Sequence, residues 1–153
     1  MRISSKVVCV VAVLFLSFPL LRADRLEAAT LTFVSDTIST SIPGAPADHT
    51  IRFTTTTTIP ANGRITVTLP PETFKIPALL GLLDIDVSKN GVEQTLGPLP
   101  LLFIVGVSVV TGTQGSITFT FPSSVASGST IVVKIGKHAS AGGPGTERIR
   151  NPL

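Results

Sequence analysis

The eleven residues from His49 to Ile59, HTIRFTTTTTI, decide the fold. Ile51, Phe53 and Ile59 share one face of an extended chain with two threonines, while the other face carries an arginine and four threonines. β-Branched side chains stand at nearly every position, and they favour strands over helices because their χ1 rotation is restricted. The stretch therefore predicts a β-strand with one face in a hydrophobic core.

The residues that follow repeat this pattern after a turn. The turn Pro60–Gly63 ends in Asn-Gly, a pair that readily adopts the positive φ angles of a tight reversal. Arg64–Leu69, with the sequence RITVTL, then alternates again between apolar and polar residues. The sequence thus predicts a β-hairpin between His49–Ile59 and Arg64–Leu69.

Further alternating segments, separated by proline and glycine, follow along the chain. A second hairpin is predicted around Asn90-Gly91, and a third strand pair is predicted between SITFTF and TIVVKI. The predicted strands are Leu31–Ile38, His49–Ile59, Arg64–Leu69, Ile85–Lys89, Val92–Leu96, Ile104–Thr111 (buried), Ser116–Phe121 and Thr130–Ile135. About seven to eight short strands predict an all-β fold, an antiparallel β-sandwich of the Ig-like or Greek-key type.

The N-terminal residues have a different character. Met1–Lys6 carries two cations, and Val7–Leu21 is an apolar run of about 15 residues, shorter than the roughly 20 that span a bilayer. We expect a signal helix within a signal peptide at 1–29, cleaved near Ala29, or alternatively a retained N-terminal anchor. The sandwich domain is then 30–153, and its Gly- and Ser-rich end, 136–153, is predicted to be a flexible tail.

Charge and cysteine content narrow the possible functions. Four of the 12 Lys and Arg and two of the 9 Asp and Glu precede Thr30, so the domain carries a net charge of only +1. Nucleic-acid binding needs a clustered basic face, so we expect no nucleic-acid partner. The only cysteine, Cys9, lies in the leader, which leaves the domain without a thiol nucleophile or a thiolate ligand.

Catalytic motifs are not found in the sequence. The histidines, His49 and His138, lack metal-binding spacing and are expected to be exposed loop residues. Asp84 and Asp86 share one face of a strand and are candidate calcium ligands, because hard oxygen donors at the end of a sandwich suit that ion. No loop of the D-x-D-x-D-G type supports them, and solvated charge at a strand end is the other interpretation. We expect no enzyme activity and no cofactor.

With catalytic residues excluded, phenylalanine and threonine are the remaining side chains that could bind a sugar or another protein. There is no Trp and no Tyr, and the phenylalanines after the leader are expected in the core or as loop staples, so sugar stacking is not predicted. Thr54–Thr58, with Thr50, Thr66 and Thr68, predicts one threonine-rich face. That face is either a β-favouring surface or an O-glycosylated or self-associating one.

Three stretches resemble a module of secreted surface proteins from poorly characterised bacteria. They are ADHTIRF at 47–53, IPANGRITVTLPP at 59–71 and IRNP at 149–152. The resemblance covers nearly all of 31–152 and implies an Ig-like sandwich outside the cell. In such modules a further strand follows Asn-Pro. Here that strand is missing after Leu153, which is expected either from truncation or from donation of the strand by a neighbour.

These observations predict a non-catalytic structural or adhesive module, secreted to the extracellular cell surface, that acts through sheet faces and edges. Its expected partners are other cell-surface or matrix proteins, including further copies of itself. Membrane contact is expected only through an uncleaved N-terminal segment. The alternative is a soluble extracellular binding module for a small ligand or a calcium ion, with its site at Asp84 and Asp86 or at the loop Pro77–Leu83.

Overall fold

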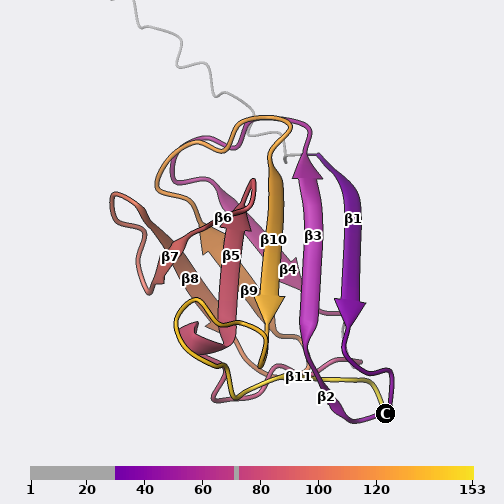
Figure 1. Cartoon of the computed structure of the whole chain (residues 1–153). Helices are drawn as coiled ribbons and strands as arrows, with labels where there is room; N and C mark the ends of the chain where they lie inside the picture. The colour runs from indigo at the N-terminus through magenta and orange to yellow at the C-terminus, as the bar shows by residue number, and fades with distance from the viewer. Residues whose placement is uncertain (1–29, 71–72) are drawn as a thin grey trace, which may run out of the picture.

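A computed structural model describes residues 30–70 and 73–153, which form two facing β-sheets (Figure 1). The first sheet contains, in spatial order, β1 (Leu31–Ile38), β3 (His49–Thr55), β10 (Thr130–Ile135), β5 (Ile85–Lys89) and β6 (Val92–Glu93). The second contains β4 (Arg64–Thr68), β9 (Ser116–Thr120), β8 (Ile104–Val110) and β7 (Thr95–Gly97). Two short strands, β2 (Pro46–Ala47) and β11 (Ile149–Arg150), pair separately. The predicted all-β sandwich is confirmed.

One hydrophobic core lies between the two sheets. The alternation predicted for His49–Ile59 is present, since Ile51 and Phe53 are buried while Arg52 between them is exposed. The second sheet contributes Ile117 and Phe119 to the same core. Alternation within each strand therefore gives two inward faces that pack on one another, as a sandwich requires.

Two of the predicted strand pairs are wrong. β3 does not pair with β4, because β3 lies between β1 and β10 while β4 pairs with β9 in the opposite sheet. β9 and β10 are likewise divided between the sheets. The chain between β3 and β4 crosses from one sheet to the other, and it is held by a bridge between Ile59 and Val125. Alternation shows which residues of a strand point inward. It does not show whether two strands pair within one sheet or face each other across the core.

The hairpin predicted around Asn90-Gly91 is confirmed only in part, because the predicted strand Val92–Leu96 is divided between β6 in the first sheet and β7 in the second. β5 and β6 pair antiparallel, with Ser88 opposite Glu93. Asn90 and Gly91 have φ angles of 52° and 79°, the positive pair that a two-residue hairpin turn needs. The strand predicted at 104–111 is also present as β8, whose first half is largely buried.

The C-terminal segment, residues 136–153, packs against the lower end of the sandwich in Figure 1 and differs from the expected flexible tail. Ala139 and Ile149 are fully buried, and β11 pairs with β2. Asn151 is 5% exposed, and its side-chain amide donates to the carbonyls of Thr40 and Ile42. Composition alone could not show this order, because the contacts come from distant parts of the chain.

The predicted threonine-rich face is wrong as a single surface. β3 and β4 lie in different sheets, so Thr54 and Thr66 face solvent on opposite sides of the molecule. On the second sheet the hydroxyls of Thr66 and Thr118 hydrogen bond across strands at 3.0 Å. The threonines therefore form two separate outer surfaces.

The phenylalanine prediction holds only in part. Phe53, Phe119 and Phe121 are buried, whereas Phe33 and Phe103 are 84% and 86% exposed. Phe33 lies at an irregularity of β1, where the register with β3 shifts between Thr32 and Ser35 and the Phe33 φ angle is 51°. A bulge turns the side chains of a strand away from strict alternation.

The leader lies outside the described residues, so the signal peptide, the N-terminal anchor and Cys9 stay predictions. Among residues 30–70 and 73–153, no helix is long and apolar enough to cross a membrane.

Candidate functional site

The acidic pair singled out in the sequence is buried rather than solvated. Asp84 ends the short 3-10 helix η1 (Leu82–Asp84), and Asp86 follows in β5. Each is only 4% exposed. A buried carboxylate is stable only where donors replace the water it has lost, so the partners of these two side chains define the site.

Asp84 accepts hydrogen bonds from three backbone N–H groups. Gly81 donates to Oδ2 at 2.9 Å, and Thr146 and Glu147 donate to Oδ1 at 2.7 and 2.9 Å. The Asp84 carboxylate therefore closes its own helical turn on one side and binds the C-terminal segment on the other.

Asp86 binds the same C-terminal segment at residues nearer to its start. The backbone N–H of Ser140 donates to its Oδ2, and the N–H of Ala141 lies 3.1 Å from both of its oxygens. Charge-assisted bonds of this kind are stronger than neutral ones. The two aspartates thus act as a structural clamp for residues 140–147.

The geometry gives no second set of ligands for a cation at this clamp. Within the described part of the chain, no group of three or more His, Cys, Asp or Glu side chains is arranged to hold a metal ion. The oxygens of Asp84 and Asp86 instead face backbone donors. Calcium prefers six to eight oxygen ligands, and these two carboxylates alone fall well short of that number.

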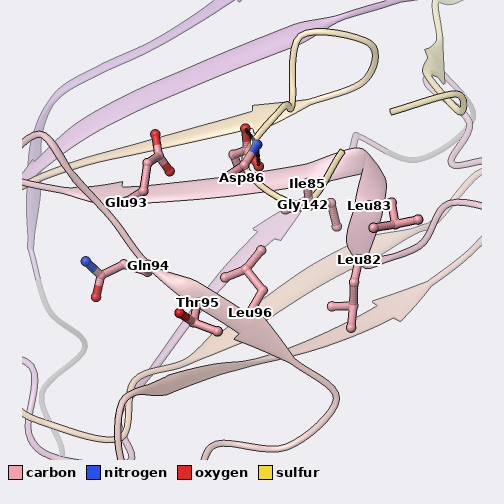
Figure 2. Close-up of a pocket in the computed structure, with 10 residues that line it drawn as sticks. Leu82, Leu83, Ile85, Asp86, Glu93, Gln94, Thr95, Leu96 and Gly142 are labelled. Carbon is pink, nitrogen blue, oxygen red and sulfur yellow. Dashed lines mark hydrogen bonds between the residues drawn. The ribbon is translucent and has the colours of Figure 1, made fainter. Parts of the chain in front are cut away.

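A pocket of ≈ 420 Å³ lies beside the clamp (Figure 2). It lies where β5 and β6 of the first sheet approach β7 of the second, and the C-terminal segment closes one wall. The lining residues are Leu82, Leu83, Ile85, Asp86, Glu93, Gln94, Thr95, Leu96, Ala141 and Gly142. The leucines give the pocket an apolar lining, and its charged groups, Asp86 and Glu93, are both acidic.

The predicted exposed position of His49 is wrong. Its side chain is 1% exposed, its Nδ1–H donates to Asp36 Oδ2 at 2.8 Å, and its ring meets Phe74 edge-on. This hydrogen bond fixes the orientation of the His49 ring. His138 is half-buried, with Nε2 3.0 Å from the Thr50 hydroxyl. The two histidines thus have separate structural partners.

Two of the stretches that carry the resemblance contain residues that hold distant segments of the chain together. In ADHT, Asp48 Oδ1 accepts from the backbone N–H of Lys137 at 2.9 Å. In IRNP, Ile149 is buried and Asn151 fastens the turn at 40–45 through its side chain and its backbone N–H. The sequence pattern indicated these residues but not their role. Their hydrogen-bond partners are backbone groups, which no sequence pattern identifies.

The fold and the site together define an all-β sandwich whose buried acids fasten its own C-terminal segment. Comparisons of the chain with protein-family models, with characterised proteins and with solved structures found no match.

Proposed function

We propose that this protein is a non-catalytic structural or adhesive module of the extracellular cell surface. The observation that supports the proposal most directly is the clamp, where Asp84 and Asp86 bind the protein's own backbone. Carboxylates occupied in this way stabilise the fold and leave recognition to the outer surfaces. We also propose that the sandwich is Ig-like, as the resemblance of its motifs implies.

The sheet surfaces support an interaction role. Both outer faces present threonine, and the exposed large hydrophobic residues include Phe33, Leu102 and Phe103. Leu102 and Phe103 are adjacent on one loop, and contiguous exposed apolar groups are typical of contact surfaces between proteins. The export leader predicted at 1–29 supports an extracellular location for those contacts, with other surface or matrix proteins as partners.

Export and surface exposure are directly testable. We expect an antibody against the sandwich domain to label intact producing cells, and we expect brief protease treatment of those cells to remove the signal. A variant lacking residues 2–29 is expected to stay in the cytosol and escape the protease. Full protection of the native chain in intact cells would contradict the proposal.

A second candidate is a soluble binding module for a small ligand or calcium, and the pocket favours its small-ligand form. A ligand that binds only the folded state raises the melting temperature. Because the clamp oxygens already accept backbone hydrogen bonds, we expect about 5 mM calcium to leave the melting temperature within about 1 °C of its value in chelator. Circular dichroism melts would measure it, with magnesium as the matched control. A rise specific to calcium would favour the second candidate.

A further inference from the structure

The loop between β7 and β8 carries an apolar knob. Leu99, Leu101, Leu102 and Phe103 are 64%, 59%, 85% and 86% exposed. The last two occupy the tip of a tight turn in which Leu101 and Ile104 exchange backbone hydrogen bonds. In Figure 1 this loop projects from the left flank of the sandwich. Consecutive large apolar side chains at a projecting tip are costly in water, so a partner that buries them gains free energy.

The knob is held in place by the fold. Pro100 packs so closely on β8 that a Cβ at Gly106 would lie 2.6 Å from its ring. Leu102 has a φ angle of 44°, a left-handed conformation that is unfavourable for a bulky residue. A rigid, strained tip loses little entropy on binding, and backbone strain of this kind is concentrated at functional sites.

The same flank carries a pocket that complements the knob. Its volume of ≈ 420 Å³ is large enough for a leucine or phenylalanine side chain, and Leu82, Leu83 and Leu96 line it. Figure 2 shows these leucines around the opening, and β7 leads from Leu96 directly into the knob loop. One chain therefore presents both an apolar projection and an apolar hollow.

The charges around the two features are opposite in sign. A separate pocket next to the knob is lined by Arg64 together with Leu99 and Pro100. The charged residues of the leucine-lined pocket are Asp86, whose oxygens accept from the N–H groups of Ser140 and Ala141, and Glu93, which is exposed. No charged residue occurs between Glu93 and Lys134, so the knob itself is uncharged. Complementary potentials favour contact between the knob side of one molecule and the pocket side of another.

We propose that the apolar knob of one molecule enters the leucine-lined pocket of a second copy of this chain. The inference rests on the proposed function, because it identifies the module's partner as a further copy of itself. Contacts between different patches of identical subunits produce closed rings or extended filaments according to their geometry. Self-association by this route would build a coat or matrix from a single component.

Sedimentation velocity of the full chain tests the proposal. Interference optics are needed because the chain has no Trp or Tyr. We expect the mean mass to rise with concentration between about 1 and 100 μM, and we expect Leu102→Ser with Phe103→Ser to weaken association about tenfold or more. Leu83→Glu, in the pocket wall, is expected to act similarly. The matched control is Leu79→Ser, which alters an exposed leucine outside both features.

Mixing the variants gives the sharpest result. A knob variant and a pocket variant that each stay monomeric should form a mixed pair, because one intact knob still meets one intact pocket. A wild-type monomer at 100 μM, or a mixture that stays monomeric, would overturn the proposal. So would knob-dependent flotation of a monomer with phosphatidylcholine vesicles, which would assign the knob to a lipid surface.

The two levels of the proposal fail separately. A surface-exposed chain that does not self-associate would remove the knob-and-pocket contact and leave the surface module intact. A chain confined to the cytosol would remove the proposed function, whatever it does in the centrifuge.

Discussion

Phe119→Ala is expected to lower the free energy of unfolding by about 3–5 kcal/mol. Phe119 is 1% exposed and lies in β9, the second strand of its sheet, where it faces the core between the two layers. Truncation removes most of a large side chain and leaves a cavity that the flanking strands can only partly fill. Urea unfolding followed by circular dichroism would measure the loss, which is a large fraction of the 5–15 kcal/mol typical of a domain.

The matched control is Phe103→Ala, because Phe103 is 86% exposed. We expect this change to alter the free energy of unfolding by less than about 0.5 kcal/mol. Phe119 lies inside a predicted strand and Phe103 directly before one, so the two variants remove the same side chain from a buried and from an exposed position. Equal costs for the two variants would contradict the core assignment.

Most of the longer strands and their inward faces could be predicted from the sequence, whereas the short strands β2, β7 and β11 and most strand partners could not. β3 was found from its alternation, and the β5–β6 hairpin was found because Asn90-Gly91 specifies a turn type. The link between β3 and β4 also contains Asn-Gly, but only Asn62 adopts a positive φ, and the chain crosses to the other sheet there. Turn residues permit a reversal without deciding whether it stays within a sheet.

The candidate site was predictable in position but not in role. The sequence singles out Asp84 and Asp86 because carboxylates at alternate positions of a strand share one face and could bind a cation together. Apart from Gly81, their partners are backbone N–H groups more than 50 residues away, in a segment whose glycines and serines predicted flexibility. Every non-proline residue carries such a donor, so no sequence pattern reveals the pairing. The exposed Phe103 was missed for a related reason, since an apolar residue in an apolar stretch predicts burial.

Asp84→Ala is expected to lower the free energy of unfolding by about 3 kcal/mol or more, because it leaves three backbone donors without their acceptor. The loss is expected to be concentrated in the C-terminal segment. Hydrogen exchange of the Thr146 and Glu147 amides should therefore accelerate more than exchange in β10. Urea unfolding and native-state exchange of the full chain would measure the two effects.

Two variants separate the clamp from a general effect of charge. Glu93→Ala removes an exposed carboxylate from the pocket beside the clamp and is expected to change stability by less than about 0.5 kcal/mol. Asp84→Asn keeps one acceptor oxygen, so it should retain part of the stability and slow the exchange of Thr146 relative to Asp84→Ala. If Asp84→Ala instead resembled Glu93→Ala, the other contacts of the C-terminal segment would be enough to hold it, among them the buried Ile149 and the hydrogen bonds of Asp86 and Asn151. The carboxylate would then be free to bind a ligand, which links the stability of this segment to the choice between a structural module and a binding module.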